Sequence, residues 1–282
     1  MNHKAELKLH RFLDKATDGE RVLSDANINK IAKDIKEALH RQFGSQNNRK
    51  EFRLRMSNIG KPTCQLWFEK NQPEKALPLP NNFVMNMMLG DIVEAVFKGL
   101  LRQAGVAYDD SKKVSMELKI DSKIEGTYAI VMDDAVDDIK SASDWSYKNK
   151  FQSFDTLADG DAFGYVGQLA GYAQALNKRA GGWWVVNKAN GNFKYVPAAI
   201  DMRKELTKLK ETVEKVNENK FERCFEAVPE TYRGKPSGNM VLNDNCKFCD
   251  YRFECWPNMK ELPSKVSQAR EPKTVAYVEL QE

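Results

Sequence analysis

Apolar positions recur every three or four residues in several stretches of the chain, which is the spacing of one face of an α-helix. Near the N-terminus these positions are Ile28, Ile31, Ile35 and Leu39, with lysine and arginine residues among the polar positions between them. The pattern predicts a helical region over residues 1–50. The same periodicity predicts three more helices, at residues 83–103, 161–177 and 205–219.

Alternation of apolar and polar residues predicts strands between these helices. Outside the centre of the chain, the predicted strands cover residues 114–120, 182–187 and 192–196. Strands that alternate with helices indicate an α/β fold with a mixed central sheet. We expect three parts along the chain, a helical region, an α/β domain and a loosely attached tail, at residues 1–50, 51–262 and 263–282.

The central stretch GTYAIVMDDAVDDIKSAS places two runs of strand-forming residues on either side of Asp133 and Asp134. Such a pair between two runs predicts a tight hairpin turn. With that turn, Ala129 lies opposite Asp138 on the neighbouring strand. Because directly opposed residues share one face of a sheet, we expect Ala129, Asp138 and Lys140 on the same face.

Asp138-Ile139-Lys140 is an acid-x-lysine triplet, so that a carboxylate and an ammonium group project side by side. Such a pair can hold a divalent cation and direct an attacking water. A nuclease site of this kind usually has a second carboxylate on the neighbouring strand, where this chain has Ala129. When the triplet is taken alone, an exposed hairpin with a charged outer face is the simpler explanation.

The composition is that of a soluble globular protein, with 41% hydrophobic and 30% charged residues. No apolar run approaches the length of a membrane span, and the N-terminal residues are too polar for a secretory signal. We therefore expect a cytoplasmic protein, bacterial or viral, with no membrane partner. The net charge of +4 says little, but Arg49, Lys50, Arg53 and Arg55 form a basic stretch that either contacts nucleic acid or faces solvent.

Three of the five cysteines have the C-x2-C-x5-C spacing of metal ligands: Cys246, Cys249 and Cys255. Cys64 supplies a fourth thiolate, which is enough for tetrahedral Zn²⁺ or for a four-iron cluster. Buried, inert cysteines are the alternative, but the charged residues around this set argue against it. Cys224 falls outside the spacing, and we interpret it as an ordinary thiol. The spacing alone does not distinguish zinc from iron.

Two shorter patterns lie on predicted helices. Gln168 and Tyr172 form Q-x-x-x-Y, which puts both side chains on one helix face, and Gly90 and Glu94 form G-x-x-x-E. The stretch after the central hairpin holds aromatic and basic candidates for contact with single-stranded DNA: Trp145, Tyr147, Lys148 and Lys150. Each pattern alone matches many proteins by chance.

The order of these patterns is more specific than any one of them. Cys64 comes first, followed by G-x-x-x-E, the acid-x-lysine hairpin, Q-x-x-x-Y and C-x2-C-x5-C. Over residues 55–256 this order resembles the RecB-type branch of the PD-(D/E)xK nuclease superfamily. The best match within that branch is the group with an iron–sulfur cluster, which includes the CRISPR-associated exonuclease and the AddB nuclease domain.

The resemblance implies a PD-(D/E)xK fold, a restriction-endonuclease-like mixed sheet flanked by helices and stapled by a 4Fe–4S cluster. The residues that match the family's cluster ligands are Cys64, Cys246, Cys249 and Cys255. Asp138 and Lys140 match its catalytic pair, and position 129 matches its metal-binding acid. Glu94 stands where histidine is frequent in the family, which makes it a candidate metal ligand.

The resemblance also implies a role for each candidate residue at the catalytic site. Mg²⁺ or Mn²⁺ binds Asp138, the Ile139 carbonyl and Glu94. Lys140 activates the attacking water or stabilises negative charge on the phosphate. Gln168 orients this lysine, and the tyrosine of the same Q-x-x-x-Y motif contacts the DNA strand.

Ala129 is the departure from the family pattern, because many relatives have aspartate at this place. We interpret it as an inactivating substitution made by engineering. The alternatives are a naturally inactive homologue, or a site in which Asp133 or Asp134 replaces the missing acid. The hairpin register disfavours the last alternative, since both residues fall in the turn.

The sequence therefore predicts a metal-dependent deoxyribonuclease, an exonuclease acting on DNA ends in recombination, repair or viral DNA processing, with this chain inactive or nearly so. It contains no P-loop motif, so we expect no helicase motor. One alternative is a DNA-end-binding or scaffold protein with a vestigial site. Another is a CRISPR adaptation nuclease within a larger complex. Recombination or replication proteins are the expected partners besides DNA.

Overall fold

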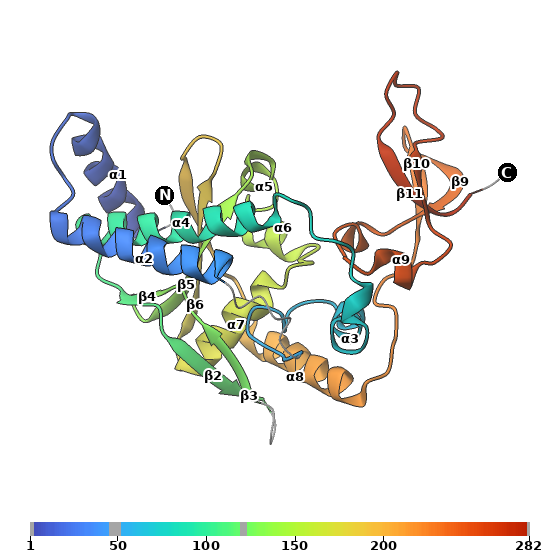
Figure 1. Ribbon diagram of the computed structural model, residues 1–282, viewed down its shortest axis with the longest axis horizontal. Helices are drawn as coiled ribbons and strands as arrows, with labels where there is room; N and C mark the ends of the chain where they lie inside the picture. Colours follow the sequence, from blue (N-terminus) through green and yellow to red (C-terminus); the bar gives the residue numbers. More distant parts are fainter. Residues whose placement is uncertain (1–2, 45–51, 119–122, 281–282) are drawn as a thin grey trace.

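A computed structural model describes residues 3–44, 52–118 and 123–280 (Figure 1). Its helices are α1 (Lys4–Thr17), α2 (Asp25–Phe43), α3 (Thr63–Asn71), α4 (Phe83–Gln103), α5 (Asp144–Lys148), α6 (Phe154–Ala158), α7 (Tyr165–Leu176), α8 (Met202–Glu218) and α9 (Arg252–Cys255), with short 3-10 helices η1 (Pro73–Lys75) and η2 (Asp244–Cys246). Its strands are β1 (Asp109–Asp110), β2 (Lys113–Glu117), β3 (Lys123–Thr127), β4 (Ile130–Met132), β5 (Ala135–Ala142), β6 (Arg179–Asn187), β7 (Phe193–Pro197), β8 (Val228–Tyr232), β9 (Lys235–Val241), β10 (Lys260–Pro263) and β11 (Thr274–Glu279).

Within the described residues, the main sheet has five strands in the order β1-β4-β5-β6-β7. β5 and β6 run parallel, and the other neighbouring pairs are antiparallel. α1 and α4 pack on one face of this sheet, and α7 packs on the other (Figure 1). The predicted class, an α/β protein with a mixed sheet flanked by helices, is confirmed.

The central hairpin has the predicted turn. Asp133 and Asp134 have left-handed φ angles of 49° and 60°, as a two-residue turn of type I′ requires. Ile130 pairs with Asp137, which is the predicted register of the two strands. β4 itself is short, however, and begins only at Ile130.

Alternation along β5 divides the core into two hydrophobic clusters, one on each face of the main sheet. Val136 packs on the α7 face, together with Leu169 and Trp183. Ile139 packs on the opposite face, together with Phe97 of α4 and residues of α1. Because both faces are covered, side chains on β5 are buried whichever way they point, and polar side chains there need protein partners.

The two N-terminal helices are built into the α/β domain. Glu6 of α1 accepts a hydrogen bond of 2.9 Å from the backbone N–H of Tyr195 in β7. Asn27 of α2 donates to the Gly99 carbonyl of α4 at 2.8 Å. A Cβ at Gly99 would lie 2.3 Å from the side chain of Ile31, so α2 and α4 are in close contact. The described part of the N-terminal region therefore shares its core with the sheet.

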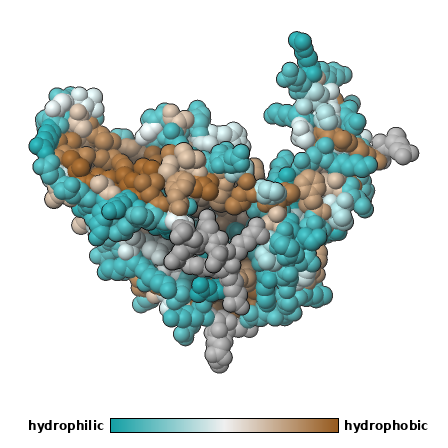
Figure 2. All heavy atoms as spheres, in the orientation of Figure 1, coloured by the Kyte–Doolittle hydropathy of each residue, from teal (hydrophilic) through white to brown (hydrophobic). Residues whose placement is uncertain are grey.

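α4 has the predicted bounds, but only its second half is buried. Phe97 and Leu101 belong to the core. Apolar residues of the first half are exposed, namely Phe83, Met85, Met87 and Leu89. Figure 2 shows hydrophobic side chains gathered along this helix. Among the described helices, α4 included, none combines the length and apolar character that crossing a membrane requires.

The C-terminal part of the chain forms a second sheet, with described strands in the order β10-β11-β9-β8. β11 pairs with both β10 and β9. Tyr277 of β11 is buried, and its hydroxyl donates to Glu230 of β8 at 2.9 Å. The prediction of a loosely attached tail at residues 263–282 is therefore wrong for Thr274–Glu279.

Asp137 is a carboxyl group buried on the α1 and α4 face of β5. The Tyr195 hydroxyl donates to it at 2.8 Å, and Trp184 Nε1 lies 3.4 Å from its other oxygen. Burial raises the pKa of Asp137 to about 7, although these two donors oppose the shift. Asp137 lies on the opposite face of β5 from Asp138, and its partners are neutral donors instead of a lysine.

The loop before α7 lies directly against the loop before α3. A Cβ at Gly164 would lie 2.5 Å from the carbonyl carbon of Gly60, and Gly164 has a left-handed φ of 71°. Only glycine fits both conditions. The contact joins the start of α7 to the segment that leads into Cys64.

We expect Gly164→Ala to destabilise the protein much more than Gly191→Ala. Both glycines have left-handed φ angles, 71° and 77°, so alanine costs about 1–2 kcal/mol of backbone strain at either position. A Cβ at Gly191 meets no heavy atom of the described residues within 4 Å, whereas the Gly60 backbone blocks one at Gly164. Urea unfolding of the two variants measures the difference. Equal losses in the free energy of unfolding would contradict the close contact.

Candidate functional site

The acid-x-lysine triplet lies on β5, the middle strand of the main sheet. Asp138 Oδ2 lies 2.7 Å from Lys140 Nζ, and Asp138 Oδ1 accepts the backbone N–H of Ile139 at 3.0 Å. Asp138 is only 8% exposed, so its charge depends on this lysine rather than on water. The carboxylate and the ammonium group project side by side, as the sequence predicts, toward α7.

α7 extends this pair into a polar chain. Lys140 Nζ donates to Gln168 Oε1 at 3.2 Å. Tyr172, one turn further along the helix, hydrogen-bonds with Gln168. The structure thus brings the acid-x-lysine triplet and the Q-x-x-x-Y motif together at one place.

Tyr165 is a member of the site that the sequence analysis did not select. The centroid of its ring lies 4.6 Å from Lys140 Nζ, within the range of a cation–π contact. Tyr165 lies three residues before Gln168, which places both side chains on the same face of α7. The three-residue spacing between Tyr165 and Gln168 is the feature of the sequence that could have identified Tyr165 as a member of the site.

The surroundings keep Lys140 charged and Tyr172 neutral. Burial lowers the pKa of Lys140, but Asp138 and Tyr165 raise it, and the net shift is upward. Burial raises the pKa of Tyr172 to about 12. The site therefore holds a positive charge and a neutral hydroxyl group near neutral pH.

Tyr172 does not offer its ring to a DNA base. Its side chain is 4% exposed and belongs to the hydrophobic cluster on the α7 face. A Cβ at Gly126 would lie 2.8 Å from this ring and 2.6 Å from Met56, so β3 packs directly against it. Its hydroxyl bonds to the backbone of Thr127. The predicted contact of Tyr172 with DNA does not fit this burial.

Ala129 lies one residue before β4, outside the paired part of the hairpin, which begins with Ile130 opposite Asp137. Its side chain is buried in the cluster on the α1 and α4 face, with Ile130 and Ile139. The prediction that its methyl group faces the acid–lysine pair is therefore wrong. The chain leaves the two-stranded sheet of β2 and β3 at Thr127 and enters the main sheet at Ile130, so alternation is interrupted between them.

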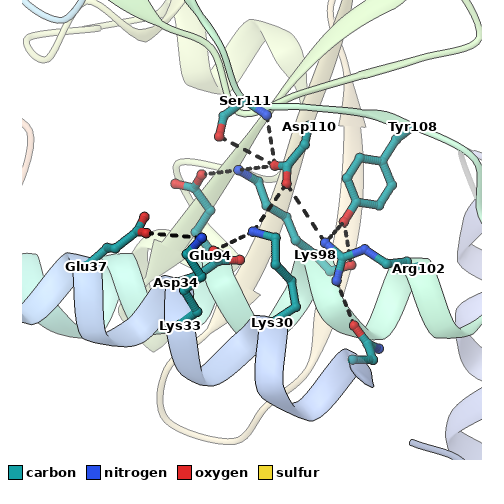
Figure 3. Close-up of polar contacts among 11 residues, drawn as sticks. Lys30, Lys33, Asp34, Glu37, Glu94, Lys98, Arg102, Tyr108, Asp110 and Ser111 are labelled. Atoms are coloured by element: carbon teal, nitrogen blue, oxygen red, sulfur yellow. Dashed lines mark hydrogen bonds and ion pairs between the residues drawn. The ribbon is translucent and has the colours of Figure 1, made fainter. Parts of the chain in front are cut away.

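Glu94 lies in an ion-pair network between α2, α4 and β1 (Figure 3). Its carboxylate is 2.6 Å from Nζ of Lys98, a buried lysine that also lies 3.4 Å from Asp110. Asp110 pairs with Ile130 of β4, so the network borders the edge of the main sheet. Among the contacts of the described residues, none joins Glu94 to Asp138. Glu94 is engaged with a lysine instead of standing free for a metal ion.

The aromatic and basic stretch after β5 forms α5 and the loop behind it. Trp145 is exposed, and Lys148 makes a surface ion pair. Tyr147 packs against the core. Lys150 lies near the ring of Tyr165, with its nitrogen 5.3 Å from the ring centroid. Of the predicted DNA contacts, Trp145 and Lys148 are exposed, the Lys150 side chain is 16% exposed, and Tyr147 is largely a packing residue.

The four predicted cluster ligands come from separate elements of the chain. Cys64 lies in the first turn of α3, Cys246 ends η2 and Cys255 ends α9. Electrostatic interactions join Cys255 to each of the other three thiols, Cys249 included, so the four share one neighbourhood. The start of the α/β domain and the segment before β10 therefore meet at these cysteines.

Cys224 also belongs to this neighbourhood. Its sulfur accepts the backbone N–H of Cys64 at 3.1 Å and lies 3.3 Å from the Thr63 hydroxyl. The hydrogen bond with Cys64 lowers the pKa of Cys224, and the same contact raises the pKa of Cys64. The C-x2-C-x5-C spacing gave no sign of this contact, because it depends on the path of the chain after α8.

The two candidate metal sites differ in how well their residues fit a metal. The described residues contain no group of three or more His, Cys, Asp or Glu side chains arranged to hold an ion. The cysteines match an iron–sulfur cluster in donor type alone, since thiolates are its usual ligands and all four are half-buried free thiols. The Asp138 site fits Mg²⁺ or Mn²⁺ poorly, because hard cations need several oxygen ligands and its carboxylate is paired with Lys140.

Comparison with known proteins assigns no family to this chain. No family model matches it, and no curated protein matches it. Among solved structures, the crystal structure of SSO0001 is similar, with a TM-score of 0.43 and 13% sequence identity over 82% of this chain and 96% of the other. A similarity this distant carries no argument about family or function.

We expect Asp138→Asn and Lys140→Met each to lower the free energy of unfolding by up to about 3–5 kcal/mol, because each leaves a buried charge without its partner. The double variant should lose clearly less than the sum, since neither charge remains. Chemical denaturation of the four proteins measures this coupling. Lys148→Met, which removes an exposed ion pair, is the matched control and should change stability little. Additive losses would contradict a buried, coupled pair.

Proposed function

We propose that this chain is a deoxyribonuclease of the PD-(D/E)xK type, similar to the RecB branch, which acts on DNA ends and cleaves poorly with its present sequence. The observation that carries the proposal is one polar chain of four residues: Asp138, Lys140, Gln168 and Tyr172. Its members come from two motifs on different elements. Motifs that match by chance have no reason to meet through hydrogen bonds in a buried site.

Each residue of the polar chain has a role that its contacts support. Lys140, kept positively charged, stabilises negative charge on the scissile phosphate or on the attacking water. Gln168 holds the lysine nitrogen at 3.2 Å, and Tyr172 holds Gln168. Asp138 and the Ile139 carbonyl are the groups that would hold Mg²⁺ or Mn²⁺. Such an ion would supply an activated water and would neutralise charge on the phosphate.

A shortage of oxygen ligands supports poor cleavage by this sequence. Hard cations depend on several such ligands. Ala129, which matches the family's metal-binding acid, provides none and is buried on the face of the sheet opposite Asp138. The two remaining acids of the proposed set already have cationic partners. Asp138 pairs with Lys140, and Glu94 pairs with Lys98. A metal ion would have to displace a lysine from each of them.

A basic cavity beside the polar chain supports DNA as the ligand. Its volume is about 570 Å³, and Gly126 and Thr127, which contact Tyr172, lie in its wall. The charged residues of its lining are Arg53, Arg55, Lys70, Lys113, Lys123 and Glu125. Cations outnumber the single acid, which favours a phosphate backbone. Arg49 and Lys50, the other members of this basic stretch, lie outside the described residues.

A second candidate is a DNA-end-binding protein with a vestigial cleavage site. The packing of Ala129 favours it, because this side chain is buried with Ile130 and Ile139 in an apolar cluster. An aspartate introduced there would have to find a polar partner or a metal ion. Both candidates predict DNA binding, and they differ in their response to a restored acid.

We also infer that the cysteines hold a 4Fe–4S cluster that joins α3 to the segment of η2 and α9. The proposed ligands are Cys64, Cys246, Cys249 and Cys255. Their shared neighbourhood supports a common metal group, and the choice of iron over zinc rests on the resemblance to the nuclease family.

Ala129→Asp tests whether a charged side chain at position 129 leaves the α1 and α4 face, where the alanine is buried, and becomes a metal ligand beside Asp138. In the proposed nuclease we expect this variant to raise metal-dependent cleavage of end-labelled DNA by roughly 100-fold or more, the scale on which one electrostatic group changes a catalytic rate. Lys140→Met in the Ala129→Asp background should abolish this gain. Single- and double-stranded substrates with Mn²⁺ or Mg²⁺ measure both effects.

Ala129→Asn is the matched control for this experiment, because asparagine has the size of aspartate without its charge, and it should remain slow. Circular dichroism checks that each variant is folded. If the parent protein cleaves as fast as its Asp variant, the assignment of the missing ligand is wrong. A folded Asp variant that binds DNA without cutting it would favour the vestigial site.

Protein purified without oxygen should be brown and contain about four irons. Cys249→Ser should lose iron and melt at a lower temperature, because α3 and the C-terminal cysteines lose their connection. Cys224→Ser is the matched control and should retain its iron. Zinc without iron would contradict the cluster. Loss of iron from the control would instead make Cys224 a ligand.

A further inference from the structure

A row of aromatic rings leads from the acid–lysine pair to the surface. Tyr165 covers Lys140 Nζ at 4.6 Å. Phe163 stacks on Tyr165, with ring centroids 5.6 Å apart and an angle of 17° between the rings. Phe248 continues the row, with its centroid 6.5 Å from that of Phe163 and a tilt of 31°. We call Tyr165, Phe163 and Phe248 the aromatic row.

The outer members of the aromatic row are strongly exposed. Phe163 is 49% exposed and Phe248 is 76% exposed. They come from distant parts of the chain, the loop before α7 and the loop between Cys246 and Cys249. Single exposed apolar side chains are ordinary, but two phenylalanines that adjoin across the fold form a contiguous apolar surface. Packing in the core does not explain why these two rings lie at the surface.

Positive charge accompanies the aromatic row. Lys150 Nζ lies 5.1 Å from the ring centroid of Phe163 and 5.3 Å from that of Tyr165. Asp161 lies 4.0 Å from this nitrogen, at the limit of an ion pair. Lys140 stands at the inner end of the row. Exposed aromatic rings and lysine nitrogens are the two features by which proteins bind single-stranded nucleic acid, the rings for its bases and the nitrogens for its phosphates.

We propose that Phe163 and Phe248 form a stacking platform for the bases of single-stranded DNA, along which the strand runs to or from Lys140. The proposal deepens the proposed function and rests on it, since the aromatic row ends at the lysine assigned to cleavage. In a duplex the base faces are stacked on one another, so they cannot stack on these rings. A single strand offers one base face after another.

The platform also ties the cysteines to DNA binding. Phe248 lies within the C-x2-C loop, which is closed by a hydrogen bond of 3.1 Å from the Cys249 N–H to the Cys246 carbonyl. The loop therefore sets the position of the outer ring. Phe163 lies outside this loop, so a substitution at Phe163 tests the platform without changing the cysteine loop.

The experiment measures binding of an oligothymidine, labelled at its 5′ end, by fluorescence anisotropy in EDTA at low salt. An abasic oligonucleotide of equal length provides the phosphates without the bases. Phe163→Leu and Phe248→Leu remove a ring but keep an apolar side chain, and Phe248→Tyr keeps the ring. Phe43→Leu is the matched control, because Phe43 is 58% exposed at the end of α2, outside the aromatic row.

We expect Phe163→Leu and Phe248→Leu each to weaken oligothymidine binding by roughly 5- to 150-fold, the range reported for losing one stacked base. Binding of the abasic strand should stay as in the parent, and Phe248→Tyr and Phe43→Leu should bind oligothymidine normally. Thermal melting and metal content check that each variant retains its fold. If Phe248→Leu loses its metal, Phe163→Leu carries the test.

Unchanged oligothymidine binding in both leucine variants would overturn the platform, as would equal losses for the oligothymidine and the abasic strand. A similar loss in Phe43→Leu would also overturn it. These outcomes are independent of cleavage. An Ala129→Asp protein that cuts DNA while the leucine variants bind normally would retain the nuclease and reject the platform. The reverse pattern would retain the platform and reject the nuclease.

Discussion

The buried ion pair of Asp138 and Lys140 constrains the rest of the main sheet. Taking two charges out of water is costly, and their mutual attraction offsets this only when further hydrogen bonds satisfy them. The Ile139 N–H donates a hydrogen bond to the carboxylate, and Gln168 of α7 accepts one from the ammonium group. α7 must therefore lie close to β5. Gly126 permits that approach, because a side chain there would collide with the ring of Tyr172.

The same packing links the polar site to the cysteines. The contact of Gly60 with Gly164 fixes the start of α7 against the loop that leads into α3. Cys64 lies in the first turn of that helix, beside the C-terminal cysteines. Phe163 lies next to Gly164 and stacks toward Phe248 in the cysteine loop. Stability, the proposed cleavage site and the proposed DNA platform therefore depend on one set of close contacts.

Local partners balance the acids on both faces of the main sheet. Lys140 neutralises Asp138, and Lys98 neutralises Glu94 on the other side of the sheet. Asp137 has neutral donors instead, and its pKa rises to about 7 because burial outweighs them. Each of these acids therefore has a partner close by in the described structure.

What the sequence by itself determined are the features that depend on near neighbours. The type I′ turn follows from Asp133 and Asp134, and the pairing of Gln168 with Tyr172 follows from helical spacing. Three features became known only from the tertiary structure: the sheet face on which Ala129 lies, the contact of Cys224 with Cys64, and the formation of strand β11. The first depends on a change of sheet between β3 and β4, and the others on partners far along the chain. Such long-range contacts leave no local period in the sequence, so folding alone brings them together.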